Sequence, residues 1–224
     1  MKRIIDETYH LVAKEIKLEL RQKYVLGSIL LYIVSVVFVC YLTFKQIMDV
    51  QLWNSLFWII VLFSTFNSLA KTFSHEQGVG AIYLYSLASP QAVILSKIIY
   101  NFLLTLVLNF LALIIYIIFI GSLALENANL FTLLLVIILG SFGLASIITM
   151  VAGIASKTEN SIGIMSILGF PIILPFLLTV LKFSRNALDG ISWSVNYEYA
   201  LVSLLINLMV ISLAYILFPY LWRE

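Results

Sequence analysis

Six long stretches without a single charged residue decide what this chain can fold into. Each is predominantly apolar and about 20 residues long or longer. A membrane-spanning helix needs about 20 apolar residues, because the hydrocarbon core of a bilayer is about 30 Å thick and each helical residue rises about 1.5 Å. The stretches therefore predict six transmembrane helices, at residues 24–44, 50–70, 98–120, 130–156, 160–181 and 199–222.

The composition supports a membrane protein and excludes other classes. Of the 224 residues, 62% are hydrophobic and only 11% are charged, with a mean hydropathy of +1.09. A soluble domain carries about 25% charged residues, which this chain lacks. This excludes a soluble enzyme, a nucleic-acid-binding protein and a disordered chain. The predicted fold class is an all-α integral membrane protein with a cytoplasmic N-terminal segment (1–23) and a six-span domain (24–224).

The basic residues predict the orientation of the spans. Lys and Arg are enriched in short cytoplasmic loops of membrane proteins. Placing the N-terminal segment in the cytoplasm puts ten of the 13 Lys and Arg residues on that side. Only Lys45, Lys182 and Arg185 then lie outside. We therefore expect both termini in the cytoplasm, and a multi-pass protein of the cell inner membrane.

The N-terminal segment has the rhythm of an amphipathic helix. Its apolar residues recur at spacings of three and four and form one stripe: Ile5, Tyr9, Val12, Ile16 and Leu20. Most of the charged residues lie off that stripe. A helix lying along the cytoplasmic membrane surface fits this pattern. The alternative is a cytosolic extension that packs on a partner protein.

Groups that could carry chemistry are scarce. The predicted spans contain no Asp, Glu, Lys, Arg or His, although ionisable groups within a membrane usually mark a functional site. The sequence has none of the common hydrolase, metalloprotease or nucleotide-binding motifs. His10 and His75 lie in predicted cytoplasmic segments, and the single Cys40 excludes an intrachain disulfide. We therefore expect a passive mechanical part whose energy comes from elsewhere, without its own catalytic, cofactor or metal site.

The third span carries a polar face. Asn101, Thr105 and Asn109 recur every four residues and so share one side of a helix. They are expected to form hydrogen bonds between helices, or alternatively to line a path for a polar cargo.

The fourth and fifth spans have special packing residues. Small residues at 140–156 favour close helix packing, within one subunit or across a dimer. In the fifth span, Gly169, Pro171 and Pro175 predict a bent or broken helix, because each proline removes a backbone hydrogen bond. The bend is either a hinge for transport or a static kink.

The external connection 182–198 is predicted to be the longest on that side. It carries Trp193 and Tyr197, which are typical of an interfacial aromatic belt, and it has room for a short surface helix.

The cytoplasmic loop 71–97 is the most informative connection. Gly78 and Gly80 interrupt it, and the residues that follow suggest a short amphipathic helix ending near Ser89. Pro90 is then expected to begin a helix that continues through Lys97 into the third span. An exposed amphipathic helix of this kind suits docking into a groove of a motor subunit, or alternatively only anchors the loop.

At this loop the sequence resembles a known family. The pattern Phe73-x-x-Glu76-x-Gly78, an apolar run to Ser89-Pro90, and the stretch from Ile94 to Lys97 are similar to the CcmB family. The fifth-span segment from Met165 to Phe176, with its two prolines, is similar as well. CcmB proteins are permease subunits of the ABC-type heme exporter of cytochrome c maturation. Many relatives carry an acidic residue where this chain has Val79-Gly80-Ala81.

The resemblance implies a function and partners. Two permease copies, with an ABC-2-like fold, would pair with two CcmA-type ATP-binding subunits, and would work with a CcmC-type heme-handling membrane protein and a small helper subunit. Heme would be the cargo of the complex, and ATP would bind to the partner. The residues expected to dock the ATP-binding subunit are Phe73, His75, Glu76, Gly78, Leu84, Leu87 and Pro90.

Three other readings remain open. An ABC-2 type exporter of a lipid, polysaccharide or drug would have the same spans and N-terminal helix. An intramembrane enzyme would need clustered polar groups that the sequence does not show. A purely structural assembly subunit would co-purify without an ATP-binding subunit.

Overall fold

The computed structural model describes residues 2–21, 23–44, 49–70, 72–73, 88–156, 158 and 161–221. Within these residues the fold is all-helical and contains no strand. The helices are α1 (Lys2–Arg21), α2 (Lys23–Thr43), α3 (Val50–Leu69), α5 (Pro90–Ile120), α6 (Leu130–Ala155), α7 (Ser161–Leu188) and α8 (Trp193–Leu221), with a short 3-10 helix η2 (Leu123–Leu125).

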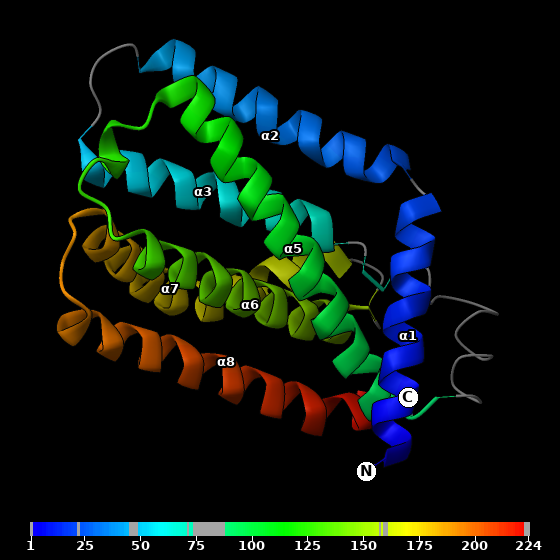
Figure 1. Ribbon diagram of the computed structural model, residues 1–224. Helices are drawn as coiled ribbons and strands as arrows, with labels where there is room; N and C mark the ends of the chain where they lie inside the picture. Colours follow the sequence, from blue (N-terminus) through cyan, green and yellow to red (C-terminus); the bar gives the residue numbers. More distant parts are fainter. Residues whose placement is uncertain are drawn as a thin grey trace.

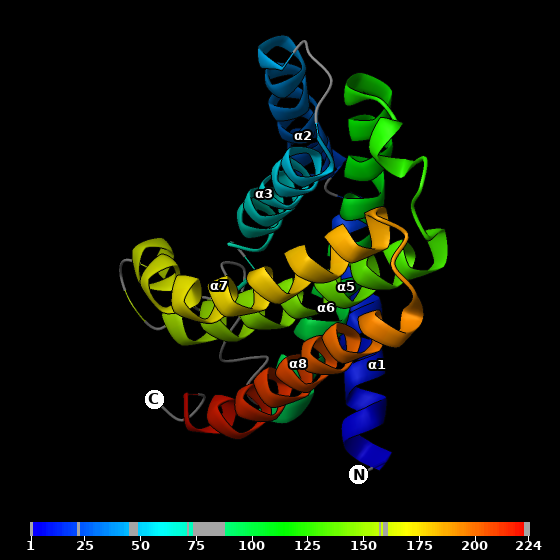
Figure 2. The same ribbon diagram turned by 90° about the vertical axis from the view of Figure 1, so that its left-hand side faces the viewer.

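The helices form a bundle with one helix across its end. Helices α2, α3 and α5 to α8 run through the bundle and alternate in direction, whereas α1 lies across one end, roughly perpendicular to most of them (Figure 1). The end of α3, the start of α5 and the end of α8 lie at this same end, which we call the α1 end (Figures 1 and 2). The opposite end, which carries η2 and the connection between α7 and α8, is called the loop end.

Five helices are long and apolar enough to cross a membrane: α3, α5, α6, α7 and α8. Helix α2 is also apolar, but its apolar stretch Gly27–Thr43 is shorter than a full span. Among the described residues the structure thus supports a multi-pass membrane protein with five candidate spans, whereas the remaining predicted span, 24–44, corresponds to α2.

The helix boundaries follow from local sequence signals. Asp49 accepts a hydrogen bond from the Leu52 N–H at 3.0 Å and begins α3, and Asn129 does the same for Thr132 at 3.2 Å and begins α6. Pro90 occupies the first turn of α5, as predicted. Gly121, with φ of 100°, follows α5, in a backbone region that favours glycine.

Helix α6 is the centre of the bundle, because most of its residues are buried and it packs against α3, α5, α7 and α8. Its glycines allow close approach. A Cβ atom at Gly140 would overlap the Trp58 ring, and one at Gly143 would overlap Phe176 and the Asn207 side chain. The predicted role of the small residues in close packing is therefore confirmed within one subunit.

The long external connection predicted at 182–198 is wrong. Helix α7 continues to Leu188 and α8 begins at Trp193, so only Asp189–Ser192 connect them. Charged residues mark where a span leaves the hydrocarbon, but a helix can continue into water. The connection is tight because Gly190 has φ of 68° and lies against the Asn127 carbonyl, where a Cβ atom would be 2.5 Å from the oxygen.

Candidate functional site

The polar face of α5 lies inside the bundle. Asn101, Thr105 and Asn109 are each at most 1% exposed. The Asn101 side-chain amide donates to Thr149 Oγ1 at 2.8 Å, and the Asn109 amide donates to Ser141 Oγ at 2.8 Å. Both acceptors belong to α6. This face therefore joins α5 to α6 and does not line an open path in the described residues.

Further asparagines, which the sequence analysis does not single out, join other helices. The Asn54 amide of α3 donates to the Leu181 carbonyl of α7 at 2.9 Å, and its carbonyl oxygen accepts from Ser184 at 2.7 Å. The Asn207 amide of α8 donates to the Leu139 carbonyl of α6 at 3.3 Å. These contacts could have been predicted from the sequence, because a lone asparagine within an apolar run places an amide in the membrane, where it needs a hydrogen-bond partner on another helix.

The described residues next to the predicted docking loop are firmly held. The backbone carbonyl of Thr72 accepts from Lys97 Nζ at 3.1 Å, and its hydroxyl accepts from the Asn101 amide at 3.3 Å. Phe73 is only 6% exposed, and its ring packs 5.8 Å from the ring of Phe218 at the end of α8. The chain thus leaves α3 in contact with both α5 and α8.

As expected, the helix that begins at Pro90 continues through Lys97, and Lys97 is buried within α5, where it is 3% exposed. Its ammonium group forms an ion pair with Glu15 Oε1 of α1 at 3.2 Å and lies 5.7 Å from the centre of the Phe73 ring. A buried ammonium group needs such partners, because desolvating an unpaired charge is costly. The short run of apolar residues before Lys97 belongs to the same helix.

The start of α5 is also attached to α1. One carboxylate oxygen of Glu7 accepts from the Ser89 backbone N–H at 3.0 Å and from the Ser89 hydroxyl at 2.6 Å. These two hydrogen bonds, with a smaller contribution from Arg3, lower the pKa of Glu7 below its ordinary value of 4.5. Ser89 has an extended backbone and makes no side-chain cap of its own, so Glu7 satisfies donors at the start of the helix.

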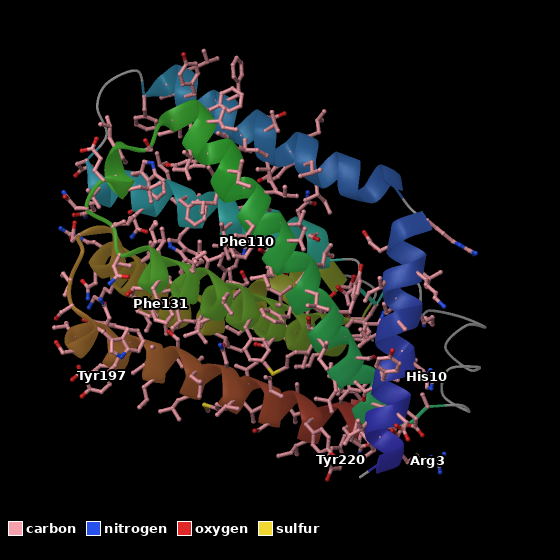
Figure 3. All side chains as sticks on the ribbon, viewed as in Figure 1. Arg3, His10, Phe110, Phe131, Tyr197 and Tyr220 are labelled. Atoms are coloured by element: carbon pink, nitrogen blue, oxygen red, sulfur yellow. The ribbon has the colours of Figure 1, made fainter. Side chains whose placement is uncertain are left out.

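Helix α1 is present as predicted, but its apolar stripe is turned outward. Ile5 is 63% exposed and Tyr9 is 71% exposed, whereas Thr8 is buried and the Glu7 and Glu15 side chains face α5. His10 also points away from the bundle (Figure 3). The face toward α5 therefore contains polar and acidic side chains beside the apolar Leu11, which packs against the core.

Of the predicted docking residues, the structure describes Phe73 and Pro90. Phe73 is buried beside α5 and α8, and Pro90 is in the first turn of α5. His75, Glu76, Gly78, Leu84 and Leu87 lie outside the described residues. The two described positions lie at the α1 end, on either side of residues 74–87.

Helix α7 passes through both prolines without a break, so the predicted alternative of a broken helix is wrong. Pro171 and Pro175 lie on its exposed side. The neighbouring helical turns hold the backbone in place although each proline lacks an N–H group. Gly169 is buried, and a Cβ atom added there would meet the Ile173 and Val151 side chains at ordinary contact distance.

Groups that bind iron are sparse in the described part of the chain, where His, Cys, Asp and Glu form no group of three or more that could hold a metal ion. The one thiol, Cys40, is half-buried on α2. Cysteine thiolates do bind heme iron, so Cys40 is a side chain within the predicted span 24–44 that has iron-binding chemistry.

Aromatic side chains mark both ends of the bundle. Phe131, Trp193 and Tyr197 are exposed at the loop end, and Tyr9 and Tyr220 are exposed at the α1 end (Figure 3). Such belts are typical of the two membrane–water interfaces.

Comparison with known proteins gives one result. A model of the family described as CcmB protein matches residues 6–220. A search of curated proteins and a search of solved structures found no match. The matched segment begins within α1, includes all the bundle helices and ends close to the end of α8. The chain therefore belongs to the CcmB family, the heme-exporter permease family of cytochrome c maturation.

Proposed function

We propose that this chain is the transmembrane permease of an ABC-type heme exporter, and that it couples ATP hydrolysis on a CcmA-type subunit to movement of its own helices. Family membership supports the heme-export role. The observation that carries the coupling is the attachment of Thr72 and Phe73 to two helices, α5 and α8, because these residues lead directly into the predicted docking loop. A force on that loop reaches the bundle through them.

In this proposal α2 is the sixth span and the α1 end faces the cytoplasm. Among the described residues, the loop end carries two basic residues, Lys182 and Arg185, whereas α1 alone carries five, Lys2, Arg3, Lys14, Lys17 and Arg21. This asymmetry supports an inner-membrane protein with both termini inside. Reporter fusions after Glu126 and after Glu224 test it: we expect an external signal from the first and an internal signal from the second, and the reverse contradicts the orientation.

Helix α1 then lies along the cytoplasmic membrane surface. Its outward stripe, with Ile5, Tyr9 and Ile16 exposed, would enter the headgroup region, while Lys17 and Arg21 stay in water. A helix across the end of the bundle has the orientation that this requires (Figure 1).

The contacts indicate how movement of the docking loop reaches the other helices. From Thr72 it passes through Asn101 to Thr149 of α6, and from Phe73 it passes to Phe218 of α8. The proposed hinge is the Gly169–Pro175 part of α7. If α7 bends there during transport, Pro171→Ala with Pro175→Ala should raise thermal stability and lower heme delivery. An unchanged delivery rate would make the prolines a static feature.

Heme itself is proposed to be held mainly by a CcmC-type partner, while two copies of this chain transmit motion and a small helper subunit assists. We expect the purified chain alone to bind heme weakly, and Cys40→Ala to leave that weak binding unchanged. Stoichiometric binding with a histidine- or thiolate-ligated spectrum would contradict the proposal.

The direct test is co-purification in mild detergent with the ATP-binding subunit. Glu76→Lys and Leu84→Asp change the docking loop and should release that subunit while the permease still inserts into the membrane. The exposed residue Asp6 of α1 provides the control, and Asp6→Lys should retain the subunit. If both loop variants keep the ATP-binding subunit and its activity, docking is elsewhere.

A further inference from the structure

Helix α1 holds α5 through two acidic side chains at matching positions. Glu7 binds Ser89, and Glu15 binds Lys97. The spacing is the same on both helices, since 15 − 7 = 8 and 97 − 89 = 8, which is about 12 Å of helix. The start of α5 therefore runs alongside α1 in the same direction for about two turns.

These contacts are more than a surface attachment. The Glu15 and Lys97 side chains are 15% and 4% exposed, so the ion pair is largely removed from water. The Glu7 carboxylate accepts two hydrogen bonds from one residue, at the positive end of the α5 dipole. An amphipathic helix that only rested on its own protein would turn its apolar stripe inward, whereas α1 leaves Ile5 and Tyr9 of that stripe exposed and turns Glu7, Thr8 and Glu15 inward beside Leu11.

The same acidic residues reach both sides of residues 74–87. On one side, Ser89 is bound directly by Glu7. On the other side, Glu15 binds the ammonium group of Lys97, which donates to the Thr72 carbonyl and lies near the Phe73 ring. One helix thus connects to the residue that follows the loop and, through Lys97, to the two that precede it.

We propose that Glu7 and Glu15 are positioning residues that make α1, the chain after α3 and the start of α5 move as one unit when the ATP-binding subunit acts on the loop. This rests on the proposed coupling function and adds to it a part for α1 beyond lying on the membrane. Without the two carboxylates, α1 would lose its polar contacts with Ser89 and Lys97, and only the direct contacts of Thr72 with Lys97 and Asn101 would still join the chain after α3 to α5. The start of α5 would then be held less firmly, and less of the movement of the loop would reach α6 and α8.

The first test needs no partner. Amide hydrogen exchange is measured on the full-length chain in nanodiscs, for the wild type, for Glu7→Gln with Glu15→Gln, and for the matched control Asp6→Asn. The double variant should increase exchange in α1 and at Ser89–Lys97 about tenfold, because each lost contact is a hydrogen bond to a charged group. Exchange in α6 should not change. Equal exchange in the double variant and the control overturns the proposal that Glu7 and Glu15 hold α1 to α5.

The second test measures coupling in the assembled exporter, as heme delivered per ATP hydrolysed. With the ATP-binding subunit still bound, the double variant should deliver several times less heme per ATP, and Asp6→Asn should deliver the normal amount. Faster exchange with normal delivery per ATP overturns the mechanical role, because the contacts would then only stabilise α1. If the wild-type chain binds no ATP-binding subunit, the proposed function fails. The exchange result still decides whether Glu7 and Glu15 hold α1 to α5.

Discussion

Helices α6 and α1 both pack against α5, but with different chemistry. The α5–α6 contact is made of buried neutral groups and small residues, with Asn101–Thr149 and Asn109–Ser141 as its hydrogen bonds. The α1–α5 contact is made by carboxylates that bind Ser89 and Lys97. Shape and neutral polarity suit a region without water, where charges are expensive. Charged contacts suit the end of a bundle, where water can screen them when they open.

We infer from this difference that α6 provides the rigid part of the chain and that the contacts of α1 belong to a part that can move. The α6 contacts depend on shape, which packed interiors do not change gradually. The α1 contacts depend on a few charged groups that can break and form again. We therefore expect substitutions in α6 to affect folding first, and substitutions in α1 to affect coupling first.

The largest expected effect is at Gly143, where a side chain would overlap Phe176 and Asn207. We expect Gly143→Leu to destabilise the folded chain by about 3 kcal/mol, because overpacking forces neighbouring helices apart. Thermal unfolding in detergent measures it. The control is Gly169→Ala, where a Cβ atom meets only ordinary contacts and helix propensity favours alanine. Equal stability of the two variants would mean that α6 is not closely packed.

The next effect is at Lys97. Lys97→Met takes this donor away from the Thr72 carbonyl and from the Glu15 carboxylate, which keeps only the more exposed Lys14 as a partner, and should cost about 2 kcal/mol in thermal unfolding. Adding Glu15→Gln removes the carboxylate charge that Lys97 neutralised, so the double variant should be no less stable than Lys97→Met alone. If the two losses simply add, the residues do not interact.

A smaller effect is expected at Asn109. Its amide donates one neutral hydrogen bond to Ser141, and its Oδ1 atom has no protein partner among the described residues. Asn109→Leu should therefore cost only about 1 kcal/mol, close to the average for such bonds in membranes. A loss as large as that of Lys97→Met would remove the distinction between the two contacts.

The smallest effect is the pH dependence of the α1–α5 contact. The pKa of Glu7 is lowered below 4.5 in the folded chain, mainly by its bonds to Ser89. Its contribution is therefore complete above pH 4.5 and is lost as the pH falls through the folded pKa. Amide exchange of α1, corrected for the intrinsic effect of pH, should rise over this range in the wild type. In Glu7→Gln this extra rise should be missing; its persistence would assign the effect to another group.

The sequence predicts the helices better than it predicts their contacts. Long apolar runs and local signals such as Asp49, Asn129 and Pro90 determine where helices form, and these signals are readable without a structure. The orientation of α1 cannot be predicted from the sequence in the same way, because amphipathicity shows which face is apolar but not whether protein or lipid covers that face. The partners of Lys97 could not be predicted from the sequence either, because they come from α1 and from Thr72, which are far from Lys97 along the chain.

The shared movement of α1 and the start of α5 is tested most directly by distances between spin labels in the assembled exporter. In a Cys40→Ser background, one label on Lys17→Cys of α1 is paired with a label on Gln91→Cys at the start of α5, or on Glu126→Cys at the loop end. We expect a non-hydrolysable ATP analogue to leave the 17–91 distance unchanged and to shift the 17–126 distance. A change in the 17–91 distance on nucleotide binding would contradict movement as one unit.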